Sequence, residues 1–180
     1  MTESAEKRTV VQASARYGMY IGMLLVLIQT IQYLAGLFIS VLFFILSVTL
    51  FVVAVMMLIR DYRDKDLNGW MNYGQGVSVG AMSSLAGALI YGSFMLILVM
   101  LVDKSYIEQY FIQTREMMEA SNFPADQIDK KMDQLQENTS PWEFGYSPIL
   151  WYGFFGLIIS LIASIFFRKN PDNSFDQDTL

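Results

Sequence analysis

The chain has 180 residues, of which 54% are hydrophobic and 16% are charged, and its formal net charge is −5. It contains no cysteine and no histidine, which excludes disulfides, thiolate metal sites and thiol nucleophiles and removes the commonest general base. Charged residues are absent from 17–59, 77–102 and 144–167, and because no soluble fold of this size needs three such stretches, we predict an integral membrane protein.

The first uncharged stretch predicts two membrane spans. A helix crosses the ~30 Å hydrocarbon core with ~20 residues, and the stretch is about twice that long. We place the spans at about 17–35 and 38–59, with a break near Ala35-Gly36 because glycine weakens a helix. Residues 1–16 then form an N-terminal tail.

The other two uncharged stretches predict one span each, at about 76–102 and 147–167. With 168–180 as a C-terminal tail, 17–167 form a four-span membrane domain. The two tails and the connection between spans two and three carry eight Lys and Arg residues, whereas the connection between spans three and four carries four. The positive-inside rule therefore predicts that both termini are cytoplasmic and that 103–146 lie outside.

The external segment 103–146 predicts two helices, at about 103–120 and 124–137, separated by a turn before Pro124. The first of them could also continue span three without a break. The segment holds nine acidic and four basic residues, which indicates either a surface that binds a cation or partner or a solvated helical hairpin. Because Asp126, Asp129 and Asp133 lack the pattern of a calcium loop, we predict no metal site.

Span three carries a stripe of small residues at every fourth position, and span four has a shorter version. The positions are Gly76, Gly80, Ser84, Ala88 and Gly92 in span three, and Gly156, Ser160 and Ser164 in span four. Such a stripe lets another helix backbone approach closely. Packing within the bundle, contact with a second copy or a partner, and a substrate pathway are all compatible with the stripe.

Gln29 and Gln32 are the strongest polar pair within the predicted spans and lie on nearly the same face of span one. They could hydrogen-bond neighbouring helices or line a conduction path. Ionisable residues other than tyrosine are absent from the spans, although transporters often carry buried acids or bases where ions move. Interhelical hydrogen bonding is therefore the favoured interpretation.

Several short motifs spread over the chain point to a known family. They are Tyr17-Gly18, Asp61-Tyr62-Arg63-Asp64, Gly69 with Tyr73-Gly74-Gln75, Gly80, Glu116-Met117-Met118-Glu119, and Pro124 with Gln127-Ile128. In these motifs the whole chain resembles the domain of unknown function 4199 family of small bacterial membrane proteins, mostly from Bacteroidota. The resemblance implies four spans and an inner-membrane location. It supplies no activity and no catalytic residue, and it hints at a polyprenyl-phosphate glycosyltransferase as a neighbour.

Together these features predict an all-α, four-helix membrane bundle with an extracytoplasmic helical hairpin between spans three and four. The leading functional hypothesis is a non-enzymatic scaffold or accessory subunit of a cell-envelope complex, with no cofactor. Its expected contacts are the lipid bilayer and other membrane helices, either of a second copy or of a partner. A small oligomeric transporter or channel is the alternative. An enzyme ranks third because no paired acids stand out, and nucleic acid is not expected at a pI of 4.6.

Overall fold

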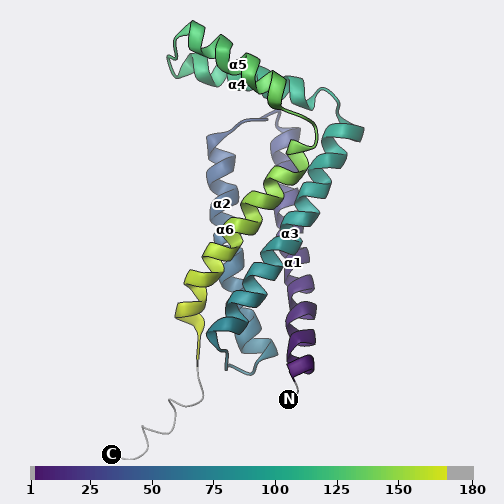
Figure 1. The fold of residues 1–180 in the computed structure, drawn as a ribbon, viewed down its shortest axis with the longest axis vertical. Helices are drawn as coiled ribbons and strands as arrows, with labels where there is room; N and C mark the ends of the chain where they lie inside the picture. The colour runs from purple at the N-terminus through teal and green to yellow at the C-terminus, as the bar shows by residue number, and fades with distance from the viewer. Residues whose placement is uncertain (1–2, 170–180) are drawn as a thin grey trace, which may run out of the picture.

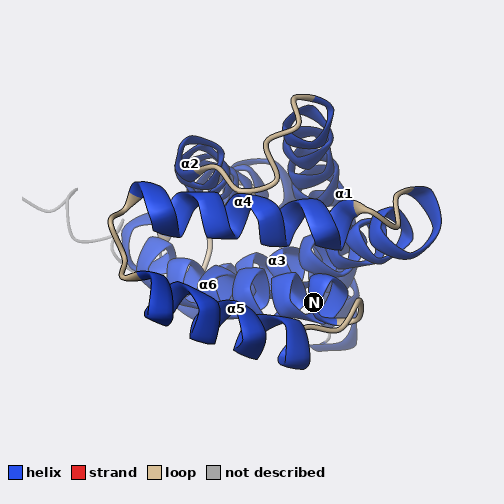
Figure 2. Ribbon diagram, turned by 90° about the horizontal axis from the view of Figure 1, so that it is seen from above, coloured by secondary structure: helices blue, strands red, loops and turns tan. Residues whose placement is uncertain are grey.

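The computed structural model describes residues 3–169, and all regular structure within this range is helical. The long helices are α1 (Glu3–Leu34), α2 (Val41–Asp61), α3 (Tyr73–Ile97) and α6 (Glu143–Phe167). Short π-helical turns, η1 (Tyr62–Asp66) and η2 (Leu98–Val102), extend α2 and α3. Two shorter helices, α4 (Tyr106–Ala120) and α5 (Ala125–Asn138), lie across one end of the bundle (Figure 1 and Figure 2). The predicted all-α membrane bundle is confirmed.

Within residues 3–169, four segments are long and apolar enough to cross a membrane, at Val10–Leu34, Val41–Asp66, Tyr73–Val102 and Glu143–Phe167. The chain is therefore a multi-pass membrane protein. Helices α1, α3 and α6 begin before the predicted spans, and the segment expected as an N-terminal tail is helical from Glu3, whereas α2 begins at Val41, after the predicted start near 38. The helices start early because charged residues end an uncharged stretch without ending a helix. Glu, Lys, Arg and Ala all favour the helical conformation.

The four spans run alternately up and down, so that the start of α1 and the end of α6 lie at the same end of the bundle (Figure 1). We call this the terminal end, and we call the opposite end, covered by α4 and α5, the hairpin end. At the hairpin end α1 stops before Gly36, whose φ of +67° lies in the left-handed region that glycine tolerates. At the terminal end, Asn72 and Gln75 form a reciprocal capping box that starts α3.

Span three and α4 are separate helices, not one continuous helix. Asp103 has an extended backbone (φ −136°, ψ 96°), and its carboxylate accepts hydrogen bonds from the backbone N–H and the hydroxyl of Ser105, at 2.9 and 2.7 Å. This local bonding offers the backbone an alternative to helix. It turns the chain so that α4 crosses the end of the bundle.

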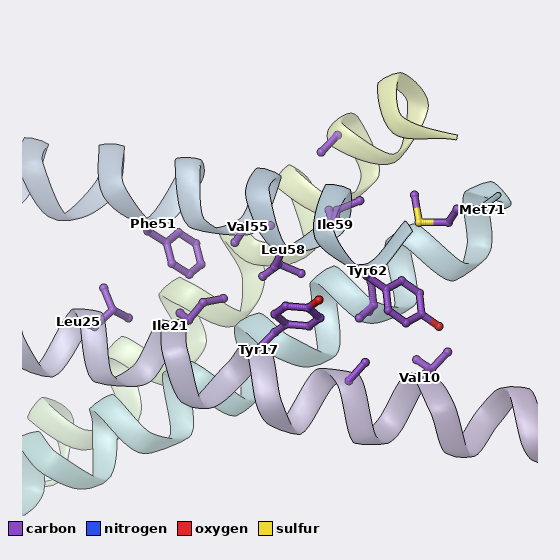
Figure 3. Packing of buried hydrophobic residues seen from close by; sticks show 13 residues of the cluster. Val10, Tyr17, Ile21, Leu25, Phe51, Val55, Leu58, Ile59, Tyr62 and Met71 are labelled. Atoms are coloured by element: carbon purple, nitrogen blue, oxygen red, sulfur yellow. The ribbon is translucent and has the colours of Figure 1, made fainter. Parts of the chain in front are cut away.

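The largest group of buried apolar side chains lies toward the terminal end, between α1 and α2 (Figure 3). Figure 3 shows Tyr17 and Ile21 of α1 on the side facing Val55 and Leu58 of α2. All four buried residues of α2 lie in its second half, from Phe51 onward.

The first half of α2 is packed much less closely. Leu42 and Phe44 are 73% and 68% exposed, respectively. Helix α2 therefore joins the bundle at the terminal end and leaves an opening beside it at the hairpin end.

Candidate functional site

The small-residue stripe of α3 lies against the small residues of α6, with the two helices antiparallel. The facing pairs are Gly76 with Ser164, Gly80 with Ser160, Ser84 with Gly156, and Gly92 with Gly145. A Cβ added at Gly80 would lie 2.8 Å from the Cβ of Ser160, and one added at Gly92 would lie 2.5 Å from the carbonyl oxygen of Gly145. Ala88 is fully buried on the same helix. The backbones therefore approach as closely as these side chains permit.

Two serines in this α3–α6 seam hydrogen-bond within their own helices. The Ser84 hydroxyl donates to the carbonyl oxygen of Gly80 at 2.8 Å, and the Ser160 hydroxyl donates to that of Gly156 at 2.6 Å. A polar group in hydrocarbon must find a partner within the protein. These hydroxyls therefore add no polar surface to the seam.

Helix α1 packs against another side of α3 through glycines that widen the same small surface. A Cβ added at Gly18 would lie 2.5 Å from the Cβ of Ala86, and one added at Gly87 would lie 2.7 Å from the Ile21 side chain. The small residues of α3 are thus covered by α1 and α6 of the same chain. They do not form a free surface for a second copy or a partner.

Gln29 lies at the centre of a buried hydrogen-bond network near the hairpin end. Its Oε1 accepts from the Tyr91 hydroxyl at 2.9 Å, and its Nε2 donates to the Tyr106 hydroxyl oxygen at 3.2 Å. The amide thus joins α1 to α3 and α4. Neither tyrosine was predicted as a functional residue from the sequence. The position of Tyr91 beside Gly92 in the small-residue stripe could have suggested a polar contact there.

The ring of Tyr106 belongs to an aromatic cluster that seals the hairpin end. Phe38, Tyr33 and Phe144 surround it with ring centroids 5.0, 6.3 and 5.7 Å away, respectively. Burial raises the pKa of Tyr106 to about 12, because a phenolate would be poorly solvated there. The cluster holds together the α1–α2 connection, α4 and the start of α6.

Polar contacts fix α4 over the same connection. The Gln113 side chain donates to the Gly36 carbonyl oxygen at 2.7 Å and accepts from the Ile39 N–H at 3.0 Å. The Tyr33 hydroxyl donates to Asp103 at 3.0 Å. Hydrogen bonds from Ser105, and then from Tyr33, hold the pKa of Asp103 below its usual value. The hairpin is therefore attached to the bundle at several points.

Gln32 lies apart from this network, on the wall of a chamber of about 400 Å³ under α4. All four spans contribute to the chamber, and Met117 of α4 covers it. Within residues 3–169, the side chains of Gln32, Ser47 and Tyr152 line this chamber without a hydrogen bond. The structure thus separates the predicted pair, because Gln29 is bonded and Gln32 faces a cavity.

A second cavity, of about 440 Å³, lies between α2 and α6, and we call it the lateral cleft. It shares Phe44, Tyr91 and Tyr152 with the chamber, so the two cavities are neighbours. The other lining residues are mostly apolar, including Val48, Val52, Trp151, Phe155 and Ile159. Among the residues that the structure describes, no charged one lines either cavity. The pair of cavities can accept neutral polar groups at one end and hydrocarbon at the other.

The terminal end holds a cluster of charges around η1. Asp66 accepts from Arg16 at 2.7 Å and from the Tyr17 hydroxyl at 3.2 Å. Arg63 pairs with Asp64 at 2.6 Å. Tyr62, within this charged segment, is fully buried. The cluster connects α1 to the end of α2 and thus serves the fold.

Among residues 3–169, no group of three or more carboxylates is placed to hold a metal ion. On the hairpin, Asp129 pairs with Arg115 at 2.7 Å across the α4–α5 interface. Arg115 also bonds Glu119 at 3.1 Å, and these two acids raise its pKa. The remaining acids of α5 are exposed to solvent.

A comparison with protein families matches residues 16–169 to the family described as "Protein of unknown function (DUF4199)". The chain belongs to this family. The match covers the hairpin and all four spans apart from residues 10–15 of the first, and it confirms the family that the sequence motifs suggested. No curated protein and no solved structure matches the chain significantly. The DUF4199 family brings no assigned activity, so the function must be argued from the geometry.

Proposed function

We propose that this DUF4199 protein is a non-enzymatic accessory or scaffold subunit of a cell-envelope complex in the bacterial inner membrane. The observation that carries the proposal is the hairpin of α4 and α5, which Gln113 and the Tyr106 cluster attach to the bundle. A rigidly attached element at the membrane surface can present a contact surface. The absence of charged residues from the lining of the chamber and cleft further supports a role without acid–base chemistry.

We infer the chemistry of the partner from exposed side chains of the hairpin. Asp126 and Asp133 of α5 are exposed, as are the apolar side chains of Ile112 and Phe123. Acidic and apolar groups together favour a partner surface that carries Lys or Arg around an apolar patch. A polyprenyl-phosphate glycosyltransferase is one candidate partner, in line with the hint from the family resemblance.

Cross-linking mass spectrometry in native membranes tests this proposal. The double substitution Asp126→Lys with Asp133→Lys is expected to lower cross-links from the hairpin to its partner at least fivefold. Lys130→Glu, on the same helix but with the opposite change in charge, serves as the control and is expected to retain them. Reproducible recovery of the protein alone from native membranes would refute the proposal. Unchanged cross-links in the double variant would also refute it.

We further propose that the hairpin is extracytoplasmic and that both termini are cytoplasmic, as the distribution of Lys and Arg favours. Because the chain has no cysteine, single substitutions report sidedness directly. A membrane-impermeant maleimide should label Ser121→Cys on intact spheroplasts, whereas Asn68→Cys should be labelled only after lysis. Labelling of Asn68→Cys on intact spheroplasts, and of Ser121→Cys only after lysis, would show that the hairpin is cytoplasmic instead.

A small oligomeric transporter remains the second candidate, because Gln29 and Gln32 both line the chamber. Transport through one copy has less support, since the close α3–α6 seam at Gly80 and Ser160 lies between the chamber and the terminal end. Flux assays in proteoliposomes address this candidate. Flux that is lost in the Gln29→Leu and Gln32→Leu double variant would favour transport, and an absence of flux for ions and small solutes in the wild type would remove it.

A further inference from the structure

The lateral cleft has the length of one membrane leaflet. Its lining residues on α6 run from Ser147 to Ile159, which is about 18 Å at the ~1.5 Å rise per residue of a helix. The hydrocarbon core is ~30 Å thick, so one leaflet contributes ~15 Å. The cleft starts near the hairpin end, where Ser147 lies close to the start of α6. It therefore spans the leaflet on that side of the membrane.

The lining of the cleft favours a hydrocarbon chain as its occupant. The walls are almost entirely apolar, and Val48, Trp151 and Phe155 among them are partly exposed, so the cleft is open from the side of the bundle. In a membrane the apolar groups beside such an opening are the acyl chains of lipids. A cavity of about 440 Å³ that runs along about 18 Å of α6 is elongated, as an extended alkyl chain is.

The chamber, which adjoins the cleft near the hairpin end, supplies hydrogen-bond donors that have no partner in the described part of the chain. Gln32, Ser47 and Tyr152 line it and make no side-chain hydrogen bond with residues 3–169. An unpaired polar group is costly in a membrane, and each of these three side chains can donate to a carbonyl or ester oxygen. An occupant with acceptors at one end and a chain at the other would satisfy both cavities.

We propose that the chamber and the lateral cleft together bind one glycerophospholipid from the leaflet on the hairpin side. Its ester oxygens accept hydrogen bonds from Gln32, Ser47 and Tyr152, and one acyl chain lies between α2 and α6. The second chain remains in the bilayer, because the first half of α2 packs loosely and leaves the cleft open. This binding site is independent of the accessory role proposed above and requires no partner protein.

Two substitutions on α2 separate cleft binding from general contact with lipid. Val48 lines the cleft and Val53 does not, and the two valines are similarly exposed, at 39% and 44%. Val48→Trp fills the cleft, whereas Val53→Trp places the same side chain outside it. Gln32→Leu removes a donor from the chamber without filling the cleft.

The measurement is native mass spectrometry of the delipidated full-length protein titrated with palmitoyl-oleoyl phosphatidylethanolamine in detergent. We expect a single saturable lipid adduct in wild type and in Val53→Trp. Occupancy should fall at least tenfold in Val48→Trp and several-fold in Gln32→Leu. A dihexanoyl lipid with the same headgroup should bind at least tenfold more weakly, because its short chains leave most of the cleft empty. Equal binding by Val48→Trp and Val53→Trp, or several equivalent adducts in wild type, would overturn the proposal.

A second measurement leaves the cleft intact in case Val48→Trp does not fold. Replacing Trp70 and Trp142 by Phe makes Trp151, which lines the cleft, the only tryptophan. Phosphatidylethanolamine brominated on its acyl chains should quench this tryptophan with saturation at about one lipid per protein. Quenching that rises in proportion to brominated lipid without saturation would refute a specific site.

Discussion

The contact between Gly80 and Ser160 predicts that one added methyl group destabilises the bundle. A Cβ at Gly80 would lie 2.8 Å from the Ser160 Cβ and 2.9 Å from the Ile59 Cδ1. The Ile59 atom ends a flexible side chain and can move, but the Ser160 Cβ is fixed to the backbone of α6. Gly80→Ala therefore forces α3 and α6 apart.

The magnitude follows from two opposing terms. Overpacking typically costs ~1–3 kcal/mol, and replacing a helical Gly by Ala recovers up to ~1 kcal/mol of helix propensity. We expect a net loss of about 1–2 kcal/mol in the free energy of unfolding. At ~2–4 °C per kcal/mol for a chain of this size, the melting temperature should fall by about 2–8 °C.

Gly153→Ala is the matched control, because it makes the same chemical change within α6. A Cβ at Gly153 would lie 3.4 Å from the Leu85 Cδ1, which is an ordinary contact. Only the propensity term then remains, so the control should be unchanged or up to ~1 kcal/mol more stable. Thermal unfolding in detergent, followed by circular dichroism and size-exclusion chromatography, compares the two variants.

Ser160→Gly should partly rescue Gly80→Ala, because it removes the atoms that the new methyl group meets. The double-mutant cycle should show a favourable interaction energy of ~0.5–3 kcal/mol. If Gly80→Ala is as stable as Gly153→Ala, the backbones are not in close contact. The packing argument for the stripe would then be refuted.

Three further predictions concern the hairpin end. Gln29→Leu should destabilise the protein by about 0.6–1.7 kcal/mol, which runs from the average to the maximum found for hydrogen bonds between membrane helices. Gln32→Leu should change the melting temperature little, and equal effects of the two substitutions would contradict the assignment of the hydrogen-bond network to Gln29 alone. The lowered pKa of Asp103 means that its contribution to stability is present above the unfolded pKa of ~3.9 and is lost as the pH falls through the lower folded value. Stability measured against pH should therefore show a gap between wild type and Asp103→Asn that closes on acidification, and a constant gap would argue against this contribution. Gln113→Ala should speed amide hydrogen exchange in residues 35–40, because it removes the hydrogen bonds of Gln113 to Gly36 and Ile39. Exchange at the wild-type rate would show that these hydrogen bonds do not hold the connection in place.

The sequence alone carried enough information for the membrane architecture. Long uncharged stretches leave a chain no alternative to the bilayer, because an apolar helix of that length has no other environment. The glycine at position 36 and Pro124 marked helix ends through local backbone chemistry, which acts over a few residues. The same locality explains why the stripe on span three was visible before its partner was known.

Only the tertiary structure decided what each helix face meets. The stripe was compatible with a partner, and the structure places α6 and α1 of the same chain on it, because their own small residues fall at the matching heights. Gln29 and Gln32 looked equivalent by spacing, yet one reaches Tyr106, 77 residues away along the chain, and the other faces a cavity. The chamber and the lateral cleft lie where the first half of α2 packs loosely against the bundle. Such contacts depend on the relative placement of whole helices, which helical periodicity within one segment does not encode.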